Sequence, residues 1–240
     1  MIHDHRPYYI KRLYLWIEGF YTRHFLQPQL QSLGQGAMFM QPWNISFFGA
    51  NISFGDFAHI VTARDRKVCL STWQFEDRQG RITIGDYCLL CPGVRLDSAS
   101  HIEIGDNCMI AANVYITDAD WHDIYDRTRP VGTTKPVKLE KNVWIGDSAI
   151  ICKGVTIGEN SIIGAGSVVA GDIPANSIAA GNPANVIKKL DEDKLLVTRE
   201  SIFSDPETHI KHVRYLDQYV LKKNSLFHWL RVILAPRKGD

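Results

Sequence analysis

Apolar residues recur at every sixth position in the second half of the chain. Five aliphatic residues lie six apart: Ile145, Ile151, Ile157, Ile163 and Val169. A second set, small or aliphatic, follows each of them by four positions: Ala149, Val155, Ser161, Ser167 and Ile173. Neither the 3.6-residue period of an α-helix nor the two-residue period of a strand keeps this phase. Triangular coils, in which each hexapeptide makes one face and one corner, would stack these residues inside, so the pattern predicts a hexapeptide β-helix.

The same pattern begins earlier and is interrupted twice. An Ile-x-Ile or Ile-x-Phe pair followed by Gly-Asp occurs at 52–56, 82–86 and 102–106. Residues 67–79 break the phase, and we expect a hairpin or loop there. Residues 118–138, here called the excursion loop, also lack the pattern but are aromatic and mixed in charge, which favours a functional loop over disorder.

Both ends of the chain have the periodicity of helices rather than of coils. Ile10, Leu13, Tyr14 and Ile17 follow helical spacing in the first segment, which glycines and a proline end before residue 44. We therefore expect a helical extension over 1–44, a β-helix over 45–190 and a second helical extension over 191–240. A terminal helix would cover the open strand edges of the last coil.

Composition excludes some functions and places the protein in a cellular context. A formal net charge of +1 argues against general nucleic-acid binding. No apolar run is long enough to span a membrane and no signal peptide is visible, so we expect a cytoplasmic protein. Five cysteines suit a reducing compartment. Cys88 and Cys91 form a CxxC, but Cys88 and Cys108 fall on inward positions of the repeat, which favours packing, and we expect no metal.

Residues 142–190 resemble the carboxy-terminal coils of the hexapeptide-repeat acyltransferases. Their sequence is NVWIGDSAIICKGVTIGENSIIGAGSVVAGDIPANSIAAGNPANVIKKL, and the likeness extends over about residues 82–190. The galactoside, maltose and polysaccharide O-acetyltransferases are the nearest relatives. The resemblance implies a left-handed parallel β-helix, a homotrimer with active sites between neighbouring rods, and acetyl-CoA as co-substrate with no permanently bound cofactor. Spacing alone does not give the handedness.

Acyl transfer from a thioester to a hydroxyl needs a base, a donor for the oxyanion and an aligned thioester. His122, early in the excursion loop, matches the position of the catalytic histidine in the relatives, and we expect it to be the general base. His101, at a corner one coil earlier, is the alternative. Asp118, Asp120 or Asp123 would orient the imidazole if a backbone carbonyl does not.

Position-matching to the relatives also implies a coenzyme groove. Its residues would be Trp144, Gly146, Asp147, Ala165, Ala170 and Lys188. The resemblance places the oxyanion donor, a main-chain N–H, near Gly146. Two departures weaken the match: relatives usually carry Thr-Lys or Lys where this chain has Ala170-Gly171, and a small serine where it has Asp147. Candidate acceptor contacts are Asp97, Asn113 and Asp120.

These features predict an O-acetyltransferase that moves an acetyl group from acetyl-CoA to a hydroxyl of a sugar or polysaccharide precursor. The alternatives are another acyl donor, a non-sugar acceptor, or a non-catalytic trimeric scaffold. A zinc-dependent γ-type carbonic anhydrase is disfavoured because His59, His101 and His122 lack the expected paired spacing. A sugar-nucleotide transferase is disfavoured because the short amino-terminal segment cannot hold a nucleotide-binding domain.

The terminal segments suggest one further hypothesis. The amino-terminal stripe is aromatic, and residues 211–240 hold seven Lys or Arg beside Trp229 and Leu230. This composition is typical of interfacial helices. A peripheral contact with the inner face of the membrane is therefore one interpretation, and packing of both helices on the trimer is the other.

Overall fold

A computed structural model describes residues 4–75, 78–191 and 193–240 of the chain. The chain divides into two compact units: residues 21–200 form the first, and residues 1–20 together with 201–240 form the second. The first unit, here called the rod, contains the hexapeptide coils. The second, here called the helical unit, contains the ends of the chain.

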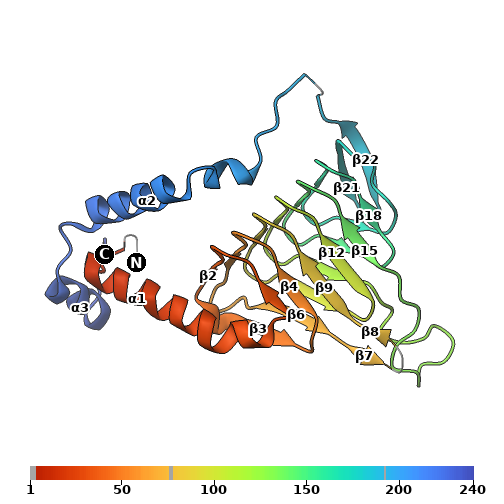
Figure 1. Cartoon of the computed structure of the whole chain (residues 1–240), viewed down its shortest axis with the longest axis horizontal. Helices are drawn as coiled ribbons and strands as arrows, with labels where there is room; N and C mark the ends of the chain where they lie inside the picture. The colour runs from red at the N-terminus through yellow and green to blue at the C-terminus, as the bar shows by residue number, and fades with distance from the viewer. Residues whose placement is uncertain (1–3, 76–77, 192) are drawn as a thin grey trace. The chain divides into compact units, whose positions relative to one another are not determined.

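The rod is built from three parallel sheets, A, B and C, which the chain visits in that order in every coil, as Figure 1 shows. Sheet A contains β1 (Ser32–Leu33), β4 (Ile52–Phe54), β9 (Arg81–Ile84), β12 (His101–Ile104), β15 (Val137–Leu139) and β18 (Thr156–Ile157). Sheet B contains β2 (Met38–Met40), β5 (His59–Val61), β10 (Leu89–Leu90), β13 (Met109–Ile110), β16 (Trp144–Ile145), β19 (Ile162–Ile163), β21 (Ser177–Gly181) and β22 (Ala184–Lys189). Sheet C contains β3 (Ile45–Phe48), β6 (Val68–Thr72), β11 (Arg95–Ser98), β14 (Tyr115–Thr117), β17 (Ile150–Ile151) and β20 (Val168–Val169). The turns between the sheets are called the A/B, B/C and C/A corners.

The six-residue pattern forms the core of the rod. All ten residues of the two sets that define the pattern are buried. The two serines among them are satisfied inside, because Ser161 Oγ donates to the Pro174 carbonyl and the Gly181 N–H donates to Ser167 Oγ. The predicted left-handed parallel β-helix is therefore confirmed.

The Gly-Asp pairs explain how consecutive coils are joined at the A/B corner. The Asp56 N–H donates to the carboxylate of Asp86 (2.7 Å), and the Asp86 N–H donates to that of Asp106 (2.9 Å). Gly85 precedes Asp86 because a Cβ at that position would overlap the Asp106 carboxylate and lie 2.8 Å from the Asp106 nitrogen. Each pair thus combines a close backbone approach with a bond between coils.

The rod begins earlier than Ile45, where we expected its boundary. Strands β1 and β2 precede that residue and pair in parallel with β4 and β5. The helical turns end at Gln29, and Phe39 then packs in the core with Leu33 against it, so residues 32–40 join the coils. Before them come a π turn, η1 (Thr22–Leu26), and a 3₁₀ turn, η2 (Gln27–Gln29), with Leu26 buried in the core. A further 3₁₀ turn, η3 (Pro42–Asn44), leads into β3.

At its other end, the rod is covered by a strand of its own. Strand β22 pairs antiparallel with β21, the last parallel strand of sheet B. This pairing uses the edge that would otherwise be open, which is the role we expected of a terminal helix. A 3₁₀ turn, η4 (Arg199–Phe203), follows, and Arg199 within it donates from Nε to the Tyr87 carbonyl.

The helical unit contains α1 (Tyr8–Tyr21, whose last residue belongs to the rod), α2 (Pro206–Leu221) and α3 (Leu226–Leu234). Asp205 caps the start of α2 and Ser225 that of α3. Lys11 Nζ lies 2.7 Å from Asp217 Oδ1, which ties α1 to α2. Among the described residues, no helix combines the length and the apolar character needed to cross a bilayer.

Both interruptions of the pattern lie at the C/A corner. After β6, the short strands β7 (Gln74–Phe75) and β8 (Arg78–Gln79) form an antiparallel hairpin; residues 76 and 77 lie outside the described residues. The sequence predicted a hairpin or loop over 67–79, but its first part is strand β6 of the rod. After β14, the excursion loop leaves the rod and returns at Val137, the first residue of β15.

Candidate active site

A buried carboxylate fastens the start of the excursion loop to the coil beside it. Asp118 is fully buried and accepts hydrogen bonds from Ser98 Oγ (2.6 Å), the Ala99 N–H (2.7 Å) and the Ser100 N–H (3.0 Å). Burial raises the pKa of Asp118, and the three donors oppose that shift. The Lys135 N–H bonds to the Asp118 carbonyl and so fixes the end of the loop at the same point.

The two arms of the excursion loop run side by side. The Asp120 N–H donates to the Thr133 carbonyl and the Gly132 N–H donates to the Asp120 carbonyl, both at 2.9 Å. A Cβ on Gly132 would lie 2.7 Å from the His122 carbonyl oxygen, so only glycine allows the arms to approach so closely. His122 is thereby held on a fastened arm with its side chain exposed.

The three aspartates near His122 are engaged elsewhere. Asp118 binds the neighbouring coil, and Asp120 Oδ1 pairs with Lys153 Nζ at 2.7 Å. Asp123 Oδ1 accepts from the N–H groups of Tyr125 and Asp126, which lower the pKa of Asp123. Within the described part of the chain, none of these carboxylates hydrogen-bonds to the His122 ring, so an orienting carboxylate remains a prediction for the assembled protein.

The alternative base, His101, lies at the start of β12 on the outer face of sheet A. Its Nε2 is 3.1 Å from Thr83 Oγ1 on the neighbouring strand. This contact gives the imidazole a structural partner on the neighbouring strand.

The predicted coenzyme residues Gly146, Asp147 and Ala165 lie at the B/C corner. Gly146 packs directly on the next coil, where a Cβ would lie 2.6 Å from the Ala165 nitrogen. The Gly146 N–H donates to the Ile163 carbonyl at 2.8 Å, so it is not available to an oxyanion. Among the described residues, the N–H of Asp147, the next residue along the chain, has no hydrogen-bond partner. Trp144, on the outer face of sheet B, is 45% exposed.

One chain does not bring all the predicted residues together. His122, Asp120 and Ala170 belong to the C/A corner. Across sheet C from them, the B/C corner contains Gly146, Asp147, Ala165 and Asn113, and Trp144 lies on sheet B. Lys188 is exposed on β22. A complete site would therefore need the B/C corner of one copy beside the C/A corner of another.

Asp97 is the predicted acceptor contact with the most unusual environment. It lies on the outer face of sheet C near the C/A corner but is only 4% exposed. Its Oδ1 accepts from Ser71 Oγ at 2.6 Å. Its Oδ2 is 2.6 Å from Arg95 Nε, an ionic contact without hydrogen-bond geometry.

The histidines of the rod do not converge. His59 is on sheet B, His101 on sheet A, and His122 on the excursion loop. Among the described residues, no three His, Cys, Asp or Glu side chains are grouped as metal ligands. Cys88 and Cys108 are buried inside the rod and donate from Sγ to the carbonyls of Gly105 and Glu140. The neighbouring Cys108 thiol and burial together raise the pKa of Cys88.

Sequence reasoning missed three side chains of this region: Trp73, Arg78 and Lys153. Trp73 and Arg78 belong to the hairpin, and Lys153 pairs with Asp120 from a later coil. Counting coils would have placed both interruptions at the same corner, because each follows a strand of sheet C.

Comparison with known proteins agrees with this geometry. A family model described as bacterial transferase hexapeptide (six repeats) matches residues 136–171, and one described as hexapeptide repeat of succinyl-transferase matches residues 102–118. The galactoside O-acetyltransferase of Escherichia coli is 46% identical over 116 residues, 47% of each chain. That of Lactococcus lactis is 29% identical over 70% of this chain and 67% of its own.

A solved structure supports the fold. A point mutant of AntD, an N-acyltransferase from Bacillus cereus in complex with dTDP-4-amino-4,6-dideoxyglucose and coenzyme A, has a TM-score of 0.53 and 22% identity, covering 80% of this chain and 96% of that one. The chain spans about half the length of the curated relatives that it matches. The coils, the family models and these relatives confirm the resemblance in the sequence: the chain contains hexapeptide repeats of the bacterial transferase type and is similar to hexapeptide-repeat acetyltransferases.

Proposed function

We propose that this protein transfers an acetyl group from acetyl-CoA to a hydroxyl of a sugar or polysaccharide precursor, with His122 as general base. The observation that carries the proposal is the fastened excursion loop, which holds an exposed imidazole beside coils that match acetyltransferases. The names of the galactoside O-acetyltransferases support an oxygen acceptor. Coenzyme A in the AntD complex supports the donor.

The reaction needs no covalent enzyme intermediate, because a thioester is already activated. Neutral His122 accepts the proton of the acceptor hydroxyl as its oxygen attacks the thioester carbonyl. The Asp147 N–H donates to the oxyanion, in place of the engaged Gly146 N–H. Collapse of the tetrahedral intermediate breaks the carbon–sulfur bond, and the imidazolium returns the proton to the coenzyme A thiolate. The products are the acetyl ester and free coenzyme A.

The outer faces of the rod support self-association. On sheet B, one row of outward side chains is largely apolar along paired strands, and it contains Met38, Leu89, Met109, Trp144 and Ile162. The matching row on sheet A is polar, and it contains Ser53, Thr83, Glu103 and Lys138. This contrast favours a homotrimer that buries sheet B and leaves sheet A in water.

A thiol-release assay with acetyl-CoA and a panel of hydroxyl acceptors tests the reaction. We expect turnover with at least one saccharide and its loss in His122→Ala. Retained turnover in that variant would show that His122 is not the general base. Absence of turnover with every acceptor would favour a non-catalytic scaffold. Mixed oligomers of His122→Ala and Ala165→Trp test sharing of the site, because a shared site restores part of the activity when the two inactive chains combine.

The helical unit supports peripheral membrane contact as a second element of the proposal. Tyr9, Leu13, Trp16 and Phe20 form an exposed apolar stripe on α1, with Trp16 61% exposed. On α3, Phe227 is 84% exposed and is flanked by further exposed apolar residues. The segments of this unit contain ten Lys or Arg against six Asp or Glu, a balance that suits an anionic lipid surface.

Vesicle co-sedimentation tests this element. We expect binding to vesicles with anionic lipid, weaker binding to neutral vesicles, and loss of binding in Trp16→Glu. Ile124→Glu, on the excursion loop, is the matched control at another exposed apolar position. A change in the oligomeric state of Trp16→Glu, with no vesicle binding by the native protein, would assign the stripe to contacts between copies.

A further inference from the structure

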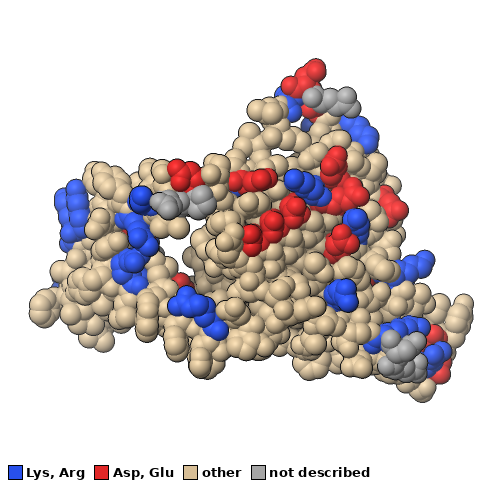
Figure 2. Space-filling view, in the orientation of Figure 1, with Lys and Arg blue, Asp and Glu red and all other residues tan. Residues whose placement is uncertain are grey.

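The hairpin and the excursion loop leave the rod at the same corner, two coils apart. The hairpin connects β6 to β9 and the loop connects β14 to β15, with the short β11–β12 turn between them. Figure 2 shows basic and acidic side chains gathered where the two segments lie. Neither matched family model covers the hairpin, so it is a feature of this chain that the family resemblance does not explain.

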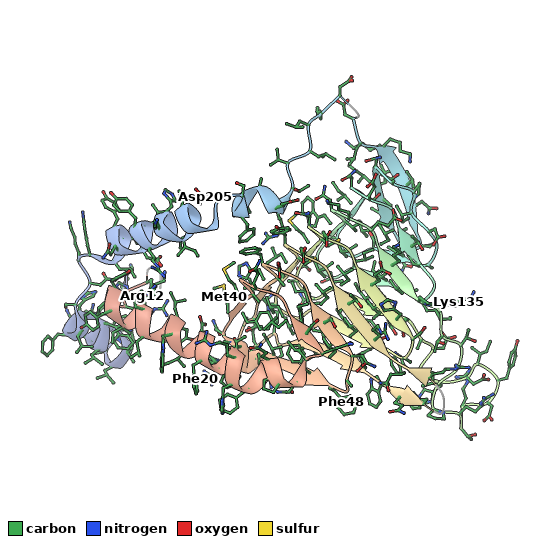
Figure 3. The ribbon with its side chains drawn as sticks, in the orientation of Figure 1. Arg12, Phe20, Met40, Phe48, Lys135 and Asp205 are labelled. Atoms are coloured by element: carbon green, nitrogen blue, oxygen red, sulfur yellow. The ribbon has the colours of Figure 1, made fainter. Side chains whose placement is uncertain are left out.

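The hairpin is anchored to the outer face of sheet C by a chain of hydrogen bonds. Trp73 Nε1 donates to Ser71 Oγ at 2.9 Å, and Ser71 Oγ donates to the buried Asp97 at 2.6 Å. The Trp73 ring also packs on Phe48, with ring centroids 4.7 Å apart. Figure 3 labels Phe48 at this edge of the sheet. Because Asp97 is shielded from water, the bond from Ser71 fixes the base of the hairpin more firmly than an exposed contact would.

The anchored hairpin contacts the excursion loop at two points. The ring of Trp73 meets that of Trp121 edge-on, with centroids 5.9 Å apart, and Trp121 immediately precedes His122. Trp121 Nε1 donates in turn to Thr117 Oγ1 on β14 (3.1 Å). Nearer the tip, Arg78 approaches the Gly132 carbonyl at 3.4 Å. The hairpin therefore supports the arm of the loop that holds the proposed base.

A cavity of about 350 Å³ lies between the two segments. Its lining includes Phe75 and Arg78 from the hairpin, and Asp123, Arg129 and Gly132 from the loop. Among the described residues of the lining, two carry a guanidinium group and one a carboxylate, and Asp123 Oδ1 already accepts two main-chain N–H groups. Gly132 packs against the main-chain atoms of His122 and Asp123, so the cavity adjoins the backbone that carries the proposed base.

We propose that this cavity binds the acceptor and that Arg78 and Arg129 bind an oxyanion on it, so that the preferred acceptor is a saccharide with a carboxylate or phosphate group. The inference rests on the proposed acetyl transfer. Guanidinium groups bind carboxylate and phosphate through paired N–H donors, and Phe75 offers an aromatic surface to the sugar ring. The anionic group would be held in the cavity, leaving a hydroxyl of the same sugar to reach His122.

The test compares arginines that line the cavity with one that does not. Arg78→Gln and Arg129→Gln remove the charges, and Arg127→Gln is the matched control, since Arg127 lies outside the cavity lining and its Nε bonds to the Ile124 carbonyl. Thiol release is measured with a neutral glucoside, a glucuronide and a glucose phosphate. Charge-assisted hydrogen bonds of about 1.5 kcal/mol correspond to a roughly tenfold rise in KM for the anionic acceptors in each cavity variant. We expect the rise in KM to be much larger for the two anionic acceptors than for the glucoside, and we expect no such difference for Arg127→Gln.

Equal KM values for neutral and anionic acceptors in the native enzyme, or an equal effect of Arg127→Gln, would overturn the proposal. The two anionic acceptors separate the carboxylate from the phosphate as the bound group. Calorimetry with the glucose phosphate, in the absence of acetyl-CoA, tests the cavity independently of acetyl transfer. Binding that is lost in Arg78→Gln but retained in Arg127→Gln would support an anion site in the cavity even if no turnover is found. If neither binding nor turnover is found, both the anion site in the cavity and the proposed acetyl transfer are wrong.

The anchor is tested by a matched pair at Ser71, which is a positioning residue in this proposal. Ser71→Ala removes the hydroxyl between Trp73 and Asp97, and Ser71→Thr keeps it. We expect Ser71→Ala to raise the KM for the acceptor and to change the near-ultraviolet circular dichroism of the Trp73–Trp121 pair, and Ser71→Thr to restore both. An unchanged spectrum and KM in Ser71→Ala would show that the hairpin needs no anchor at Asp97.

Discussion

The A/B and C/A corners of the rod are built from the same coils but carry opposite features. At the A/B corner, every described turn is short and bonded to the next by repeated groups, such as the Asp86 and Asp106 carboxylates and the Asn142–Asn160 amide pair. At the C/A corner, one turn holds a hairpin and another holds the excursion loop. Repetition at one corner fixes the stacking of the coils, which leaves the other free to carry insertions without loss of register.

This difference separates stability from chemistry. Changes at the A/B corner should alter the free energy of unfolding and leave the reaction intact, since no proposed site residue lies there. Changes at exposed positions of the C/A corner should alter turnover and leave folding intact.

His122→Ala should produce the largest change. A positioned general base contributes roughly 10²- to 10⁴-fold to the rate, so we expect kcat for acetyl transfer to fall by that factor. The side chain is exposed, so the unfolding midpoint should stay within experimental error. Steady-state thiol release and thermal unfolding measure the two quantities.

His101→Ala is the matched control for that experiment. The His101 ring contacts Thr83 on the neighbouring strand of sheet A, so its loss should leave kcat nearly unchanged. A fall in kcat for His101→Ala that matches or exceeds the fall for His122→Ala would transfer the role of base to His101.

Gly85→Ala tests stability at the A/B corner. Its new Cβ would overlap the Asp106 carboxylate and lie 2.8 Å from the backbone nitrogen of Asp106, so two coils would have to separate. Overpacking of this kind costs about 1–3 kcal/mol, which denaturant unfolding would detect. Gly171→Ala is the control, because no atom lies within 4 Å of its Cβ position. Equal stability of the two variants would contradict the close-packed corner.

Asp118 is the exception that sharpens the comparison, because it is a buried residue of the C/A corner. Asp118→Ala leaves the donors of Ser98, Ala99 and Ser100 without their acceptor, and we expect a loss of about 2 kcal/mol. The loop would loosen at its base, so kcat should also fall. A variant that unfolds like the native protein would show that these bonds do not fasten the loop.

The pH dependence of stability provides a second measurement on Asp118. Burial raises its pKa above 3.8 in the folded chain, so the native state binds the proton more strongly than the unfolded state. The contribution of Asp118 to stability is therefore greatest below pH 3.8 and is lost as pH rises through the folded pKa. The unfolding free energy of the native protein minus that of Asp118→Asn should decline over this interval, and a rise would reverse the assigned direction.

The sequence predicted the repeating parts of the molecule better than the interrupted ones. The six-residue period identified Ile145 and its equivalents as core residues because a stacked coil repeats the same environment at each turn. It gave no information on Trp73 or Arg78, whose contacts depend on two insertions meeting across intervening coils. The sequence also could not predict that the Gly146 N–H is hydrogen-bonded to the next coil, because a resemblance identifies a residue but not the hydrogen bond of its amide.

Asn160 should show the smallest effect and separates two contributions to the regular corner. Its backbone has a φ of 60°, and its side chain joins the amides of Asn142 and Asn176 at 2.9 Å each. Asn160→Gly keeps the left-handed backbone but loses both amide bonds, whereas Asn160→Ala loses the bonds and adds the strain of a Cβ in that conformation, about 1 kcal/mol. We expect a loss of about 1 kcal/mol for the glycine variant and about 2 kcal/mol for the alanine variant. If both variants unfold like the native protein, the amide ladder does not stabilise the stacking, and the Gly-Asp pairs alone must account for the regularity of this corner.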